Sequence, residues 1–213
     1  SIGSNSWAIS GEHTESGYPI LANDPHLSAQ LPPIWYENGL HCFPYGPSCS
    51  LDVVGLSFAG SPYVIIGHNS SSAWGFTNMG PDVQDLYIEK INPSNENQYE
   101  VDGSWVDMDR FTEIIYRPNE DPLIIEVRET HHGPIISDRD YPINNLKFSE
   151  QSRIELPKNY AISLSWTALY PGKTFQAIRD FNYMRNYEEF REASKNFHVP
   201  AQNLLYADVE GNI

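Results

Sequence analysis

Residues 3–10 read Gly-Ser-Asn-Ser-Trp-Ala-Ile-Ser, a flexible triplet that runs directly into an apolar segment. Taken alone, the stretch is typical of a frayed chain end, where glycine, serine and asparagine are common. A second apolar segment, Tyr-Pro-Ile-Leu-Ala-Asn, follows at residues 18–23, and the polar stretch between the two has a glycine at each end. This pattern predicts a β-hairpin with strands at residues 6–10 and 18–23.

The middle of the chain is also expected to form strands. Short apolar runs bounded by glycine and proline predict buried strands within residues 51–58, 63–69 and 73–78. From about residue 82 the pattern changes to polar alternation, which indicates an antiparallel β subdomain. Within it, Asp102-Gly103 stands between two alternating segments, and this pair predicts a tight type I′ turn because both positions need positive φ.

Helices are expected only late in the chain, which makes the predicted fold class α+β. Phe175, Ile178 and Phe181 recur at helical spacing. Asn186 is followed three residues later by Glu189, a pattern that resembles a capping box at the start of a second helix. That helix is expected to bury Phe190, Ala193 and Phe197 and to end before Pro200, after which a final strand follows.

The bulk composition limits the classes of partner. The 213 residues include 28 acidic and 13 basic side chains, for a net charge of −15. Because this charge repels phosphate groups, neither nucleic acid nor an anionic membrane surface is an expected partner. The longest apolar runs fall far short of the roughly 20 residues that a spanning helix needs. Cys42 and Cys49 could form a disulfide if the protein is exported, or remain two thiols if it is not.

Two groups of polar residues could bind metal. His131 and His132 are expected to point to opposite faces of a strand, so a shared metal ligand is not expected and a structural role is favoured. Asp82 and Asp85 flank backbone carbonyls that could complete a set of oxygen donors for calcium, although from spacing alone a solvated strand entrance is the favoured explanation.

Four blocks of sequence, in order along nearly the whole chain, resemble the start of the β subunit of penicillin acylase family amidases. They are GSNSWAIS, LANDPHLS, GHNSSSAWGFTNMGPDVQDLYIE and QNLLYADVEGNI. The resemblance implies the αββα sandwich of the N-terminal nucleophile hydrolases, present in part over residues 1–81 and 156–213. Residues 82–155 would then be a β-rich insertion.

The resemblance also implies a mechanism. The precursor would cut itself at Gly3-Ser4, and Ser4 would become both the nucleophile and, through its freed α-amine, the base, since that amine has a pKa of about 7.7–8.0. His26 matches a position whose backbone orients the serine amine. Asn78 matches the backbone N–H donor of the oxyanion hole. A chain that keeps residues 1–3 has no free amine at Ser4 and is therefore expected to be inactive.

The remaining implied roles concern metal, substrate and location. Asp82, Asp85 and the Gln84 carbonyl match structural calcium ligands, and no organic cofactor is expected. Leu27, Ile66 and Phe76 match acyl-pocket positions, so an apolar acyl group on a small amide is implied, although ordinary core packing also explains these three. The partner would be the α subunit of the same precursor, and the location periplasmic or secreted. The alternatives are a non-catalytic, calcium-stabilised secreted β module and an inactive descendant of the family.

Overall fold

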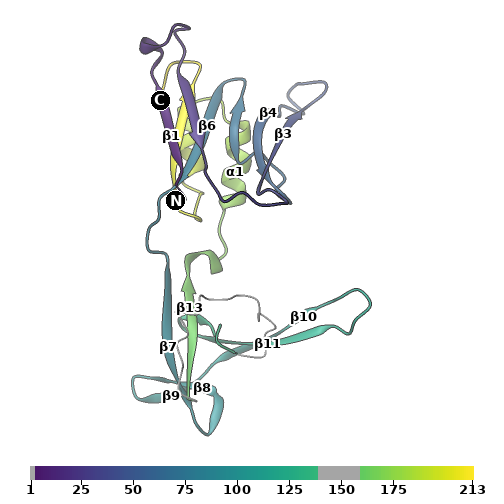
Figure 1. The fold of residues 1–213 in the computed structure, drawn as a ribbon, viewed down its shortest axis with the longest axis vertical. Coiled ribbons are helices and arrows are strands. Elements are labelled where there is room, and N and C mark those ends of the chain that lie inside the picture. The colour runs from purple at the N-terminus through teal and green to yellow at the C-terminus, as the bar shows by residue number, and fades with distance from the viewer. Residues whose placement is uncertain (1–2, 139–158) are drawn as a thin grey trace. The chain divides into compact units, whose positions relative to one another are not determined.

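The computed structural model describes residues 3–138 and 159–213. It divides the chain into two compact units, the first made of Ser1–Pro81 with Pro171–Ile213 and the second of Asp82–Tyr170 (Figure 1). The sequence analysis expected the second unit to end near residue 155. It extends further because the strand β13 (Tyr160–Trp166) pairs antiparallel with β7 (Gln84–Asn92) along its whole length.

The first unit contains two antiparallel sheets and two helices. The smaller sheet pairs β1 with β2, and the larger one has the order β14-β6-β5-β4-β3. The elements are β1 (Asn5–Ile9), the 3-10 helix η1 (Gly11–His13), β2 (Ile20–Asp24), β3 (Trp35–His41), β4 (Asp52–Phe58), β5 (Ile66–Asn69), β6 (Ser72–Asn78), α1 (Thr174–Tyr183), α2 (Tyr187–Ser194) and β14 (Gln202–Asp208). The hairpin predicted from the opening residues is confirmed as β1 and β2.

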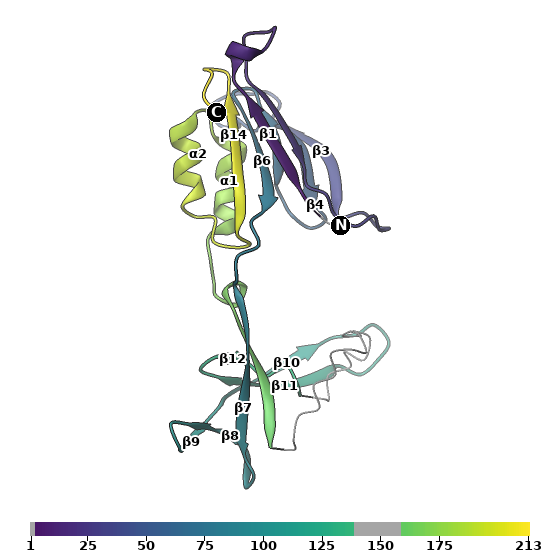
Figure 2. The same ribbon diagram turned by 60° about the vertical axis from the view of Figure 1, so that its left-hand side comes forward.

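Alternation along β6 fixes the order of the layers in this unit. Phe76 packs against Phe181 of α1, with ring centroids 5.8 Å apart. Gly75, which faces the other way, has room for no side chain because a Cβ there would lie 2.8 Å from Asn23 of β2. The helices therefore cover one face of the large sheet and the β1–β2 hairpin covers the other, as Figure 2 shows.

The helices confirm the sequence pattern in part. The side chain of Asn186 accepts a hydrogen bond from the Glu189 amide at 2.9 Å and caps α2 as predicted. Phe175, however, is 66% exposed, because it lies in the first turn of α1, away from the side that carries Ile178 and Phe181. Phe197 lies beyond the end of α2 rather than on it, although its ring still packs 5.2 Å from that of Phe76.

Over residues 82–138 and 159–170, the second unit is built from antiparallel strands in two sheets, with the orders β13-β7-β8-β9 and β10-β11-β12. Asp102 and Gly103 join β8 to β9 with φ values of 49° and 79°, which confirms the predicted turn. Besides β7 and β13, its elements are β8 (Asn95–Val101), β9 (Ser104–Asp107), β10 (Asp109–Ile115), β11 (Leu123–Thr130), β12 (Gly133–Pro134) and the 3-10 helix η3 (Thr167–Leu169).

Two further features complete the description of the fold. Cys42 and Cys49 form a disulfide that closes the loop between β3 and β4. Among the residues that the structure describes, no helix is both long enough and apolar enough to span a membrane.

Candidate active site

A cavity of about 150 Å³ opens in the first unit, where β6 ends at Asn78 and β14 begins at Gln202. Ser4 lies in its wall, immediately before the first residue of β1. Most of the other lining residues are apolar. The full lining is Ser4, Pro25, Leu27, Trp35, Phe58, Ile65, Phe76, Asn78, Thr174, Ile178, Phe197, Pro200 and Gln202.

Asn23 ties the start of β1 to the cavity. Its side chain accepts a hydrogen bond from the Phe76 amide at 3.1 Å and donates one to the Phe76 carbonyl at 2.9 Å. The same Nδ2 lies 3.4 Å from the carbonyl oxygen of Asn5, the residue after Ser4. Because Gly75 leaves space for Asn23, this one amide links β1, β2 and β6 and connects the residue after Ser4 to Phe76 in the cavity wall. Asn23 belongs to the block LANDPHLS, but no role was predicted for it from the sequence.

Four of the predicted site residues meet in the cavity wall: Ser4, Leu27, Phe76 and Asn78. His26 lies between the lining residues Pro25 and Leu27, but its imidazole is exposed and its Nδ1 lies 3.8 Å from Asp24 Oδ1. Ile66 is buried in the core and does not line the cavity, whereas Ile65 does. The two isoleucines differ because neighbouring side chains of an extended segment point to opposite sides.

Sequence reasoning assigned no site role to the other lining residues, among them Trp35, Phe58 and Gln202, which come from distant parts of the chain. The rings of Trp35 and Phe58, on paired strands β3 and β4, lie 4.5 Å apart. Within the described residues, the buried indole N–H of Trp35 has no hydrogen-bond partner. Gln202 enters the wall because it pairs with Asn78 across β14 and β6. No strand was predicted at Trp35, so no signal in the sequence placed this residue in the site.

The predicted calcium ligands lie at the start of the second unit. Asp82, Gln84 and Asp85 are all exposed. Carboxylate and carbonyl oxygens are the donors that calcium prefers, but the ion takes six to eight of them. Over residues 3–138 and 159–213, no three His, Cys, Asp or Glu side chains gather into a group that could hold a metal ion. The donor type therefore fits calcium, while these three residues alone are too few to complete a site.

The second unit also contains a buried carboxylate, Glu89 on β7. It accepts hydrogen bonds from Ser163 at 2.7 Å, from His132 at 2.8 Å and from Thr130 at 2.9 Å. Burial opposes the ionisation of Glu89, but the hydrogen bonds from Ser163, His132 and Thr130 outweigh it and lower the pKa of the carboxyl group.

The prediction that His131 and His132 point apart is wrong. Their ring centroids lie 3.8 Å from each other, because both residues belong to the turn between β11 and β12 rather than to a strand. His131 Nδ1 lies 2.9 Å from the Tyr99 hydroxyl, and the ring of His132 stacks on Tyr87 at 3.7 Å. Each imidazole therefore has a partner within the fold, which agrees with the structural role favoured from the sequence.

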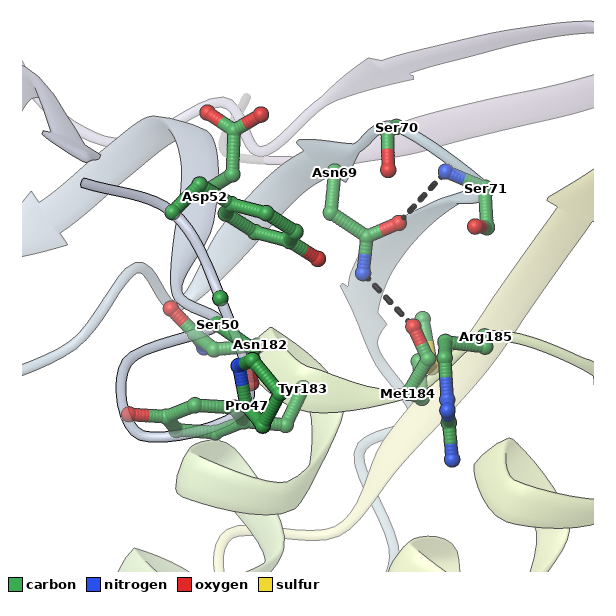
Figure 3. A pocket seen from close by; sticks show the side chains of 12 residues that line it. Pro47, Ser50, Asp52, Asn69, Ser70, Ser71, Asn182, Tyr183, Met184 and Arg185 are labelled. Atoms are coloured by element: carbon green, nitrogen blue, oxygen red, sulfur yellow. Dashed lines mark hydrogen bonds between the residues drawn. The ribbon is translucent and has the colours of Figure 1, made fainter. Parts of the chain in front are cut away.

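A larger cavity of about 540 Å³ lies at the opposite end of β5 and β6, beside the turn that joins them (Figure 3). Asn69 stands in its wall, accepting a hydrogen bond from the Ser71 amide at 2.9 Å and donating one to the Met184 carbonyl at 2.7 Å. None of the predicted catalytic or acyl-pocket residues lines it. The smaller cavity is therefore the candidate active site.

The chain is similar to known acylases along nearly its whole length. The model of the family described as penicillin amidase matches residues 1–213. The acyl-homoserine lactone acylase QuiP of Pseudomonas aeruginosa is 28% identical over 96% of this chain, and penicillin G acylase of Escherichia coli is 30% identical over 99% of it. The chain spans 23% and 22% of the lengths of these two curated relatives, respectively.

Among solved structures, the thermostable penicillin G acylase from Alcaligenes faecalis matches with a TM-score of 0.70 and 27% identity, over 97% of this chain and 33% of that one. Because the family model covers the whole chain and a solved acylase shares its fold, the chain belongs to the penicillin amidase family.

Proposed function

We propose that the protein is an amidohydrolase that cleaves a linear amide through an acyl-enzyme on Ser4. One observation carries the proposal: Ser4, in a chain of the penicillin amidase family, lies in the wall of a mostly apolar cavity together with Leu27, Phe76 and Asn78. A nucleophile beside an apolar pocket is the arrangement that acyl transfer from an apolar acid requires.

In this mechanism, scission of the Gly3-Ser4 bond frees the α-amine of Ser4. The amine takes the proton from Ser4 Oγ as the oxygen attacks the amide carbonyl, and the Asn78 backbone N–H donates to the oxyanion that develops. The same proton then passes to the leaving amine as the C–N bond breaks. Water attacks the resulting ester, which releases the carboxylic acid and restores Ser4. The backbone around His26 would hold the amine in place.

The substrate class follows from the cavity and from the relatives. The apolar lining favours an apolar acyl group, and the two relatives compared above are named for acyl-homoserine lactone and for penicillin G. We include in the proposal an α subunit from the same precursor and the complete αββα sandwich. A periplasmic or secreted location is supported by the Cys42–Cys49 disulfide, since such bonds persist in oxidising compartments.

Processing provides the test. When the protein is expressed from its complete gene, N-terminal sequencing of the mature product is expected to begin at Ser4. Ser4→Ala is expected to abolish both scission and the release of a chromogenic amine from an acyl amide. Ser6→Ala is the matched control, because Ser6 lies two residues further along β1 and is not in the cavity wall. This variant is expected to be processed and active.

Two outcomes would contradict the proposal. One is a mature N-terminus at any residue other than Ser4. The other is amide hydrolysis that persists in Ser4→Ala, which would assign the nucleophile to a different residue. The non-catalytic alternative predicts that no scission and no hydrolysis occur in the unsubstituted protein.

A further inference from the structure

The side of the large sheet that faces the helices changes from apolar to polar at the cavity. Phe76 packs against α1, and Asn78, two residues later on β6, lies on the same side of the strand. Gln202 is the direct partner of Asn78 in the antiparallel ladder. Both side chains line the cavity that contains Ser4. An amide pair therefore stands at the rim of a mostly apolar cavity, where a bound substrate can reach it.

Hydrogen bonding fixes which way the Asn78 amide points. Gln202 Nε2 lies 3.0 Å from the backbone carbonyl oxygen of Ala201 and 2.7 Å from Asn78 Oδ1. Because a carbonyl oxygen only accepts hydrogen bonds, the contact with Ala201 identifies this atom of Gln202 as the nitrogen. The atom of Asn78 that it touches must then be the oxygen. Asn78 is left with its NH₂ group to offer to a ligand, and so presents a donor.

We propose that the Asn78 side chain is a specificity determinant that donates a hydrogen bond to an oxygen on the acyl group, and that Gln202 is the positioning residue that sets its direction. This inference rests on the proposed function. It concerns the side chain of Asn78 and is separate from the backbone N–H that serves the scissile carbonyl.

The size of the cavity limits how far along the acyl chain that oxygen can lie from the scissile carbonyl. The cavity that Ser4 and Asn78 line is small, with a volume of about 150 Å³. Ser4 and Asn78 share this small space, so the oxygen must lie within the first few carbons from the scissile carbonyl. The favoured substrate class is an amide whose acyl chain carries a hydrogen-bond-accepting oxygen close to the amide bond, and a keto oxygen serves as the probe.

The experiment compares two amides of one chromogenic amine, a straight-chain acyl amide and the same chain with a keto oxygen on its third carbon. The protein from the complete gene is expected to favour the keto amide by about five- to tenfold in kcat/KM, the value of one hydrogen bond. Asn78→Ala is expected to reduce this ratio to about one. Gln202→Glu is expected to reverse it, because a carboxylate accepts from the Asn78 NH₂ group and turns the Asn78 oxygen into the cavity.

Asn203→Ala is the matched control. Asn203 donates to the Thr77 hydroxyl at 3.1 Å between the same two strands, but on the other side of the sheet and outside the cavity wall. This variant should keep the preference for the keto amide. If it loses the preference as fully as Asn78→Ala does, the effect comes from the strand pairing and the inference fails.

Binding of the two free acids separates this inference from the proposed function. In the mature protein from the complete gene, calorimetry should show tighter binding of the keto acid, and Gln202→Glu should remove that advantage. Equal dissociation constants for the two acids overturn the inference even if Ser4 proves to be the nucleophile. Tighter binding of the keto acid that depends on Gln202 supports the inference even if hydrolysis proves independent of Ser4.

Discussion

The two units of the chain hold their strands together by different means. In the first unit, Phe181 is fully buried and its ring lies within 6.3 Å of the rings of Phe76, Phe190 and Phe197. In the second, the buried apolar cluster is small, consisting of Ile91, Tyr99, Met108, Ile135 and Ala161. Beside that cluster the second unit buries a carboxylate, Glu89, that is hydrogen-bonded to three side chains from two other segments.

Buried aromatic rings and buried carboxylates stabilise a fold with different dependence on pH. Burial of aromatic rings contributes to stability through apolar area removed from water, which protons do not change. A buried carboxylate contributes only while it is ionised and its donors are in place. Both units are therefore expected to lose stability in acid, the second through Glu89 and the first through Asp208, a buried carboxylate on β14. Burial opposes the ionisation of Asp208, but hydrogen bonds from Asn212 and Tyr206 outweigh it and lower the pKa of its carboxyl group.

Phe181→Ala should produce the largest effect on stability. Removing a fully buried ring leaves a cavity at the point where α1 meets the sheet, and we expect the free energy of unfolding of the first unit to fall by about 3–5 kcal/mol. Phe175→Ala is the control on the same helix, because Phe175 is exposed and should cost less than about 0.5 kcal/mol. Denaturant titration followed by tryptophan fluorescence measures both. Equal losses in the two variants would show that α1 is not anchored through Phe181.

Glu89→Ala should produce the next largest effect on stability. It leaves the hydroxyls of Thr130 and Ser163 and the imidazole of His132 without their common acceptor, and we expect a loss of about 3 kcal/mol at neutral pH. The folded pKa of Glu89 lies below its ordinary value of 4.5, so its contribution is present above that pH and disappears as the pH falls through the folded pKa. The difference in melting temperature between the protein and Glu89→Ala should therefore shrink in acid.

Glu113→Ala provides the control for this substitution. Glu113 lies on β10 of the same unit with its side chain exposed, so its removal should change stability by less than about 0.5 kcal/mol at any pH. If the loss in Glu89→Ala were the same at pH 7 and at pH 3, ionisation of Glu89 would have no part in holding β7, β11 and β13 together.

Local chemistry decided which parts of the fold could be predicted from the sequence. The Asp102-Gly103 turn and the Asn186 cap depend on residues at most three positions apart, and both were confirmed. Phe197 was assigned to a helix that ends before it, because helical spacing continues past the point where the backbone leaves the helix. The pairing of His131 with His132 was missed, because alternation applies to a strand and these residues form a turn.

The residues of the candidate site could not be predicted from local sequence patterns alone. Ser4 and Asn78 were selected by resemblance to a family, and the structure adds that they share a cavity wall. The partners Asn23 and Gln202 make hydrogen bonds across 53 and 124 residues of sequence, respectively, and no local signal reports such contacts. Ile65 rather than Ile66 faces the cavity, because one residue of register decides the side to which a side chain points.

Removal of calcium should have the smallest effect on stability. It tests whether a metal ion contributes to the stability of the second unit at its start. If Asp82, Asp85 and the Gln84 carbonyl bind calcium together with donors from elsewhere, exhaustive chelation should lower the melting temperature of the protein from its complete gene by about 2–4 °C. The expected shift is small because all three residues are exposed. Chelation should not inhibit hydrolysis at once, since no step of the proposed acyl transfer passes through the ion.

The double variant Asp82→Asn with Asp85→Asn should begin at the lower melting temperature and show no further shift on chelation. Asp109→Asn, an exposed aspartate at the start of β10, should behave like the unsubstituted protein, because a general loss of negative charge would affect all of these variants alike. A melting curve unchanged by chelation, with no calcium found by elemental analysis, would contradict calcium binding at these residues. The exposed carboxylates at the start of β7 would then be explained by a solvated strand entrance.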